Sequence, residues 1–206
     1  VKTFPADVGM QAVSNGLQVL GGSGFCDDYP LEQYYRDIRI MSIYEGTTGI
    51  QSLDLLGRKM QMKDGKAFKL FFGEIQQTIA AAMAISDLEK YAVQLSTAVE
   101  KLIRVSKHLS KIAAMGDIEL SLADATLYQQ TFSLIAVAWQ WVKQGIAAYD
   151  ALQNGSKAED EMKFYQSKLH TLKYYFVYEL PEIDRLLQTM TSGERLTVKE
   201  DVDLLV

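Results

Sequence analysis

Apolar residues recur every three to four positions through almost the whole chain, which is the spacing of one face of an α-helix. Short links rich in glycine or polar residues join these periodic segments. No segment shows the alternation of apolar and polar residues that predicts a half-buried strand. The sequence therefore predicts an all-α fold, in which antiparallel up-and-down helices form bundle segments.

A polar turn at Lys63-Asp64-Gly65-Lys66 divides the periodic segments into two groups. Before it we expect helices over about 5–20, 30–40 and 48–60, with a glycine-rich loop after the first and a capping box formed by Thr48 and Gln51. After it we expect helices over about 67–86, 88–115, 121–152 and 157–191, the last broken at Pro181, and a final turn from Thr197. We therefore predict two domains, residues 1–62 and 63–206.

The composition of the chain argues against some classes of function. The 206 residues are 48% hydrophobic, which is enough to bury a core. The net charge of −5 argues against nucleic-acid binding, because that function needs clustered Lys and Arg. No apolar run approaches the ~20 residues of a membrane span, so we expect none.

A single cysteine, Cys26, cannot form an internal disulfide, and the sequence gives no sign of an oxidising compartment. We therefore expect a cytoplasmic protein, with Cys26 serving as a small apolar side chain. The start at Val1, without an initiator Met, indicates a fragment of a longer chain. His108 and His170 lack ligand spacing, so we expect no metal site.

Residues 1–60 contain two glycine-rich breaks beside helix ends, at 21–24 and around Gly46. Glycine permits positive φ and close approach of a ligand to the backbone, but the first break also fits a simple helix end and turn. Glu45 precedes a helix start, so it fits either a catalytic carboxylate or a surface carboxylate favoured by the helix dipole. The spacing alone leaves these alternatives open.

Four stretches in this region match, in order and spacing, the C-terminal signature of one enzyme family. They are Gln18-Val19-Leu20-Gly21-Gly22-Ser23-Gly24-Phe25, Tyr29-Pro30-Leu31-Glu32, Tyr35-Arg36-Asp37-Ile38-Arg39-Ile40 and Ile43-Tyr44-Glu45-Gly46-Thr47. Together they resemble the acyl-CoA dehydrogenases. The later helices resemble, by pattern and position, the extra C-terminal helical domain of longer members of the 3-methylmercaptopropionyl-CoA dehydrogenase type.

The resemblance implies a chemistry for the first region. Glu45 would be the base that removes the α-proton of an acyl-CoA thioester, while the β-hydrogen leaves as hydride to FAD and trans-2-enoyl-CoA forms. Gly46 would lie against the substrate. Arg36 would have a structural role, paired with Asp37 or Asp28.

The resemblance also implies partners. Thr47, Thr48 and Gly49 would contact the flavin, whereas the segment that contacts the FAD of a neighbouring subunit would comprise Gln18, Val19, Leu20, Gly21 and Gly22. A homo-dimer or larger assembly follows, with electron-transfer flavoprotein as the expected electron acceptor. The family's N-terminal helical and middle β-domains are missing from the sequence, so we expect no activity from this chain alone.

Two hypotheses remain at this point. The chain is either the base-bearing part of such an enzyme or a non-catalytic helical interaction module that retains the signature. The intact Glu45, Gln18 and glycines favour the enzyme. The sequence does not distinguish a dehydrogenase from an oxidase, and it does not reveal the preferred acyl chain.

Overall fold

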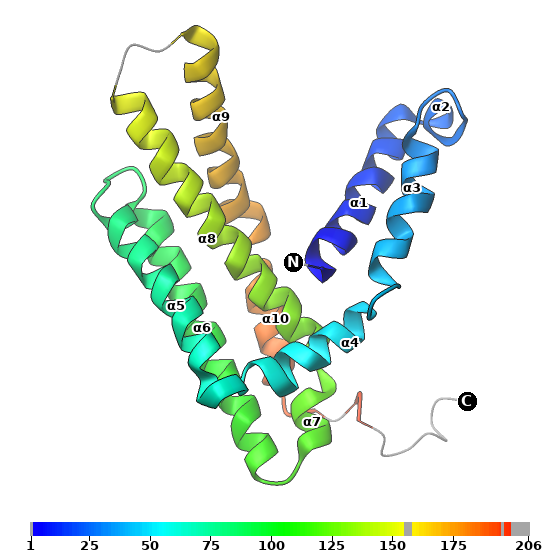
Figure 1. Ribbon diagram of the computed structural model, residues 1–206, viewed down its shortest axis with the longest axis vertical. Coiled ribbons are helices and arrows are strands. Elements are labelled where there is room, and N and C mark those ends of the chain that lie inside the picture. Colours follow the sequence, from blue (N-terminus) through cyan, green and yellow to red (C-terminus); the bar gives the residue numbers. More distant parts are fainter. Residues whose placement is uncertain (1, 155–157, 195, 199–206) are drawn as a thin grey trace. The chain divides into compact units, whose positions relative to one another are not determined.

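The computed structural model describes residues 2–154, 158–194 and 196–198, which form helices joined by short turns (Figure 1). No strand occurs in these ranges, and the predicted all-α fold is confirmed. None of the helices described is both long enough and apolar enough to cross a bilayer. Contacts between residues group the chain into two compact units, Val1–Leu55 and Leu56–Val206.

The first unit is a small group of helices with little interior of its own. Its elements are α1 (Thr3–Leu20), α2 (Gly22–Phe25), α3 (Leu31–Arg39), the 3-10 turn η1 (Ile40–Ser42) and α4 (Thr48–Leu53). Helix α1 packs against α3, η1 and α2. The residues buried in this unit are few and mostly small: Thr3, Ala6, Gly24 and Ser52. The unit therefore leaves much of its apolar surface uncovered.

The glycine-rich segment after α1 differs from the predicted loop, because residues 22–25 form one helical turn, α2. Gly24 donates its backbone N–H to the Gly21 carbonyl at 3.1 Å. A Cβ on Gly24 would lie 2.9 Å from both the Leu17 carbonyl oxygen and the Leu20 Cβ. The turn can therefore pack directly on α1 only because residue 24 has no side chain.

The second unit is a bundle of longer helices. The π-helix η2 (Asp54–Lys59) leads into it, and the first two residues of η2 belong to the first unit. The other elements are α5 (Met62–Met83), α6 (Glu89–Ala114), α7 (Ile118–Ala123), α8 (Ala125–Gln153), α9 (Glu159–Tyr174), the π-helix η3 (Tyr175–Glu179) and α10 (Glu182–Met190). Helix α6 contacts α5, α7, α8 and α10, and α8 also packs on α9. Side chains with almost no exposure form the core: Leu95, Leu102, Ile135, Val142, Leu172 and Leu186.

The polar turn predicted at Lys63-Asp64-Gly65 is present. All three residues have positive φ, of 51°, 56° and 73°, and they interrupt the right-handed helix near the start of α5. The two compact units divide earlier, after Leu55. The predicted division into domains 1–62 and 63–206 stays a prediction.

Two long helices expected from periodicity are interrupted. The segment expected over 121–152 begins earlier, where the Asp117 carboxylate accepts from the Leu120 N–H at 3.0 Å, and it breaks at Asp124 between α7 and α8. The segment expected over 157–191 widens into η3 before Pro181, where the Leu180 N–H bonds five residues back to the Tyr175 carbonyl. Proline cannot continue the α-helical ladder, so α10 starts anew. The turn expected from Thr197 to Glu200 extends beyond the described residues.

A glycine in α8 allows close approach of neighbouring side chains. A Cβ on Gly145 would lie 2.5 Å from a Leu172 methyl and 3.4 Å from a Leu88 methyl, and both leucines are buried. By contrast, nothing lies within 4 Å of a Cβ placed on Gly73, an exposed position in α5. Comparing an alanine substitution at each of the two glycines therefore distinguishes the effect of overpacking from that of helix propensity.

We predict that Gly145→Ala destabilises the protein and Gly73→Ala does not. Both changes gain the same helix propensity, about 1 kcal/mol, but only Gly145→Ala overpacks the core, which typically costs about 1–3 kcal/mol. Urea unfolding of the two variants would measure the difference in their free energies of unfolding. Equal stabilities would show that Leu172 moves aside freely.

Candidate functional site

The residues around Glu45 form a tight turn between η1 and α4. The Tyr44 N–H closes the preceding turn by donating to the Ile40 carbonyl at 3.1 Å. Glu45 then adopts a φ of 52°, and Gly46 follows with a φ of 90°. A left-handed conformation is uncommon for a residue other than glycine, and at functional sites such strain has to be held by the surroundings.

Side-chain hydrogen bonds hold this conformation from both sides of the turn. Gln51 Nε2 donates to the Glu45 carbonyl at 3.1 Å. Lys2 Nζ donates to the Gly46 carbonyl at 2.7 Å and to the Met41 carbonyl at 3.0 Å. The backbone carbonyls of both Glu45 and Gly46 are therefore fixed, although the Glu45 side chain itself is exposed.

The start of α4 corrects the predicted capping box by one residue. Thr47, not Thr48, is the N-cap, and its hydroxyl accepts from the Ile50 N–H at 3.5 Å. Thr48 Oγ1 instead donates to Asp7 Oδ1 at 3.4 Å. Gln51 was expected to bond back to the cap residue, but it reaches further, to Glu45.

The Glu45 carboxylate makes no hydrogen bond or ion pair with any residue that the structure describes. Its backbone N–H likewise has no acceptor within the described part of the chain. One residue thus presents both an uncommitted carboxylate, which can accept a proton, and an uncommitted N–H, which can donate to an oxygen.

A shallow cavity of about 500 Å³ adjoins the turn. It is lined by Asp7, Met10, Arg39, Ser42, Ile43, Thr47, Thr48 and Gly49. Arg39 places a cation there, and its Nη1 donates to Ser42 Oγ at 2.6 Å. The sequence had given no role to Lys2, Asp7 or Arg39. Lys2 lies more than forty positions from its partner Gly46, and no local pattern signals such a contact.

The second group of predicted residues, Gln18 to Gly22, lies at the other end of α1. Gly21 ends the helix with a φ of 60° and donates its N–H to the Gln18 carbonyl at 3.2 Å. A Cβ on Gly21 or Gly22 would meet nothing within 4 Å, and Val19 is 84% exposed. This surface is open to a close approach by another molecule.

The structure does not bring the two predicted groups together within one chain. Lys2, at the N-terminal end of α1, bonds to the Glu45–Gly46 turn, whereas Gly21 forms the C-terminal end of the same helix. The 18 residues of α1 span about 27 Å at a rise of 1.5 Å per residue. The cavity beside Thr47, Thr48 and Gly49 also includes Met10, which precedes Gln18 by eight residues, about 12 Å along the helix.

Two further points concern the predicted ion pair of Arg36 and groups that could bind a metal. Arg36 is exposed and forms no ion pair with Asp28 or Asp37. Among the described residues, no group of three or more His, Cys, Asp or Glu side chains could hold a metal ion.

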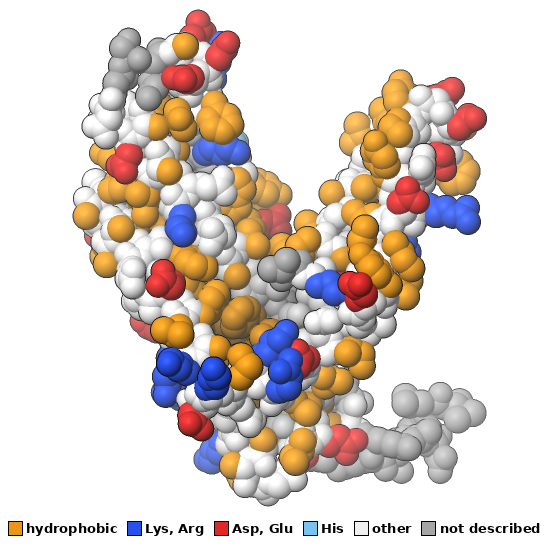
Figure 2. Space-filling view, viewed as in Figure 1, with side chains coloured by type: hydrophobic (Ala, Val, Ile, Leu, Met, Phe, Trp, Pro, Cys, Tyr) orange, Lys and Arg blue, Asp and Glu red, His pale blue; other side chains and the backbone are white. Residues whose placement is uncertain are grey.

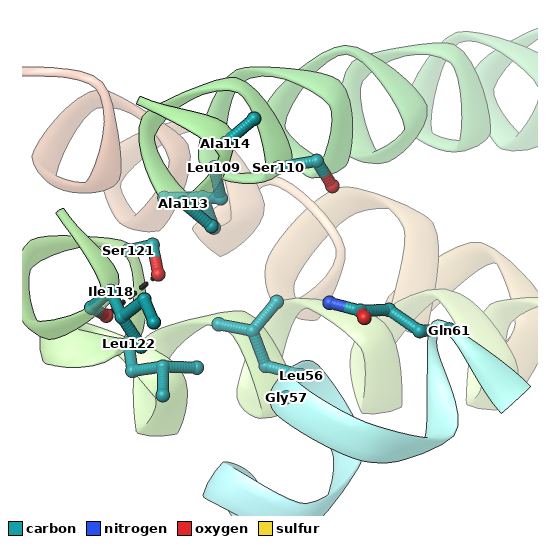
Figure 3. A pocket seen from close by; sticks show the side chains of 10 residues that line it. All are labelled: Leu56, Gly57, Gln61, Leu109, Ser110, Ala113, Ala114, Ile118, Ser121 and Leu122. Carbon is teal, nitrogen blue, oxygen red and sulfur yellow. Dashed lines mark hydrogen bonds between the residues drawn. The ribbon is translucent and has the colours of Figure 1, made fainter. Parts of the chain in front are cut away.

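The second unit contains a larger cavity, of about 630 Å³, between η2, α6 and α7 (Figure 3). Its lining is uncharged: Leu56, Gly57, Gln61, Leu109, Ser110, Ala113, Ala114, Ile118, Ser121 and Leu122. The Ser121 hydroxyl is occupied by the Ile118 carbonyl at 2.7 Å, as the dashed line in Figure 3 shows. No side chain in this lining offers acid–base or nucleophilic chemistry of the kind found around Glu45.

Comparison with protein families divides the chain in a similar way. Residues 1–61 match the family model described as "Acyl-CoA dehydrogenase, C-terminal domain", and residues 71–200 match that described as "Acetyl-CoA dehydrogenase C-terminal like". The chain belongs to the acyl-CoA dehydrogenase family. The resemblance found in the sequence is therefore confirmed.

Curated acyl-CoA dehydrogenases match along most of this chain. Broad-specificity linear acyl-CoA dehydrogenase FadE5 of Mycobacterium tuberculosis is 31% identical over 88% of this chain and 30% of its own length. 3-Methylmercaptopropionyl-CoA dehydrogenase of Ruegeria pomeroyi is 31% identical over 83% of this chain and 28% of its own length. A butyryl-CoA dehydrogenase of Syntrophomonas wolfei is 27% identical over 94% of this chain and 31% of its own length. The chain thus spans less than a third of the length of each of these relatives.

We predict that Gly46→Ala destabilises the turn of this acyl-CoA dehydrogenase segment. An added Cβ would lie 2.6 Å from Gln51 Nε2, and the alanine would have to adopt a φ of 90°. Such backbone strain costs about 1–3 kcal/mol. Gly73→Ala is the control, because its Cβ meets nothing within 4 Å and it lies in α5, outside the proposed cofactor contacts. Thermal unfolding of both variants in the full protein provides the measurement. Equal unfolding temperatures would contradict the role of glycine at position 46.

Proposed function

We propose that this chain is the base-bearing C-terminal segment of a flavoenzyme that oxidises acyl-CoA thioesters to trans-2-enoyl-CoA, with Glu45 as the base. One observation carries the proposal. Glu45 adopts a strained backbone conformation held by Gln51 and Lys2, while its own carboxylate remains free of partners among the described residues. Strain that leaves a carboxylate uncommitted has no evident structural benefit, whereas it orients the carboxylate toward a substrate.

The α-proton of a thioester is weakly acidic, so its removal needs both a base and stabilisation of the developing oxyanion. The Glu45 carboxylate accepts the α-proton. The uncommitted N–H of the same residue donates a hydrogen bond to the thioester oxygen as negative charge develops there. Gly46, without a side chain, leaves room for the substrate beside the base.

The surroundings of Gln18 to Gly22 and of Thr47 to Gly49 fit a role in holding FAD. In the first group, a Cβ placed on Gly21 or Gly22 would meet nothing within 4 Å, and Gly49 is equally open. FAD, when bound, supplies the acceptor for the β-hydrogen, which leaves as hydride. Thr47, Thr48 and Gly49 would contact the flavin on the side of the base, and electron-transfer flavoprotein is the acceptor we propose for the electrons.

The length of α1 supports an assembly of at least two copies. Gln18 to Gly22 lie at the end of α1 opposite to the Lys2 contact with the Glu45 turn, and in this proposal they contact the FAD of a neighbouring subunit. Hydrophobic side chains are also spread over α1 to α3 on the face drawn in Figure 2. The exposed ones of this unit include Val8, Val19, Phe25, Ile43, Ile50 and Leu53. A homo-dimer or larger assembly, together with the remaining domains of the full protein, would cover such surface.

We predict that Glu45→Gln in the full protein lowers the rate of flavin reduction by acyl-CoA about 100-fold to 10,000-fold, the usual range for loss of a general base. FAD content should not change, because the amide keeps the shape of the side chain. Stopped-flow absorbance of the flavin measures the rate. Glu74→Gln, an exposed glutamate of α5, is the matched control. Wild-type rates in Glu45→Gln would show that another residue is the base.

We predict that Gly22→Glu weakens FAD retention about tenfold or more. The position has open space around its Cβ, so the fold tolerates a side chain, but a carboxylate near a diphosphate is repelled by ~1 kcal/mol or more at 4 Å. Gly73→Glu introduces the same charge at an open site in α5. Fluorescence of released FAD on dilution compares the variants. Equal retention in both would place Gly22 away from the cofactor.

A further inference from the structure

A cavity of about 540 Å³ lies between α6 and α10, within the second unit and outside the proposed catalytic segment. It is lined by Lys101, Arg104, Val105 and His108 of α6, by Asp184, Leu187 and Gln188 of α10, and by Thr191. Lys101, Arg104 and His108 follow one another at three- and four-residue spacing, so they share one face of α6. Three basic side chains therefore face a cavity that contains a single carboxylate.

The charges in this lining do not cancel. Lys101 Nζ is paired with Asp184 Oδ1 at 2.5 Å, and Asp184 supplies the one carboxylate among the described residues that line the cavity. Arg104 is exposed and has no ion pair or hydrogen bond with any described residue. Within the described part of the chain, the Arg104 guanidinium of this cavity is therefore uncompensated, and its N–H groups match the oxygens of a phosphate or carboxylate.

The end of α10 does not use these cations. Basic residues beside a helix C-terminus commonly bind its last carbonyls, and Thr191 directly follows this helix. However, the Thr191 hydroxyl donates to the Leu187 carbonyl at 2.9 Å, and the Thr191 N–H donates to the Gln188 carbonyl at 3.3 Å. The Ser192 N–H donates to the Thr189 carbonyl at 3.2 Å. The helix end is capped by its own turn, so Arg104 and His108 remain available.

His108 also lines the cavity, and its two ring nitrogens differ in their surroundings. Its Nε2 is buried and has no hydrogen-bond partner among the described residues. Buried polar atoms in native proteins nearly always have a partner, so each exception calls for an explanation. With Nε2 enclosed, the other ring nitrogen, Nδ1, is the one that could donate to a ligand in the cavity.

We propose that this cavity binds the phosphate group of a small organic molecule, held by Arg104 with His108 and Gln188 as further polar contacts. The donors exceed what one carboxylate can use, whereas a phosphate presents three acceptor oxygens. The volume far exceeds the ~30 Å³ share of one water in the liquid, and Val105 and Leu187 add apolar wall. The cavity therefore has room for an organic group beside the phosphate. This site does not depend on the role proposed for Glu45.

Isothermal titration of the full protein with phenyl phosphate tests the proposal, at constant ionic strength in a chloride buffer. We expect saturable binding at one site per chain. Arg104→Gln should weaken it about tenfold or more, the effect of one lost charge-assisted hydrogen bond, and Arg104→Lys should weaken it less. His108→Gln tests the second contact. The matched control is Lys107→Gln, which removes one charge from an exposed position of the same helix outside the cavity.

Inorganic phosphate forms the second arm of the titration. Binding of phenyl phosphate that is tighter than that of inorganic phosphate, and is lost in Arg104→Gln, supports an organic phosphate ligand. Equal binding of the two, still lost in Arg104→Gln, keeps the phosphate site but overturns the organic ligand. Binding that Arg104→Gln and Lys107→Gln affect equally, or the absence of saturable binding, overturns the site. Circular dichroism of each variant excludes misfolding as the cause.

Discussion

Burial of the apolar face of α6 is the constraint on which the second unit depends. This helix contacts α5, α7, α8 and α10, and its buried residues run from Tyr91 to Leu109. Each large apolar side chain that is fully buried contributes about 1.5–3 kcal/mol relative to exposure. The neighbouring helices are therefore positioned by the need to cover α6, and two cavities of this unit lie along that helix, one beside α7 and one beside α10.

The first unit is organised differently. Few of its side chains are buried, and its central feature, the turn at Glu45 and Gly46, is held by hydrogen bonds from Lys2 and Gln51 to backbone carbonyls. Directional bonds of this kind fix the orientation of a short segment without needing a large core. A segment with so little interior gains most of its stability from what packs against it, and the relatives that this chain matches are about three times as long as the chain itself.

Helical periodicity predicted the fold class because amphipathic spacing is a local property. It could not predict where a helix breaks without glycine or proline, so the interruption at Asp124 was missed and the one at Pro181 was found. Within the site, the linked motifs identified the turn that carries Glu45. They could not reveal Lys2, since a lysine that binds carbonyls about forty positions away has no local pattern. They placed the helix cap at Thr48 instead of Thr47 because the two threonines are adjacent. The roles given to Glu45 and to the FAD-contacting residues stay predictions.

The left-handed backbone of Glu45 has a consequence for how sequence change acts at that position. Glycine adopts a φ of 52° more easily than glutamate does. Asparagine also tolerates this conformation better than most residues. A substitution scan scored by thermal stability should therefore rank glycine above glutamate at position 45, whereas a scan scored by turnover should rank glutamate first. With Glu45 as the proposed base, stability and chemistry would select different residues at this position, and the difference between the two rankings would measure how much folding free energy the protein gives up to present its carboxylate.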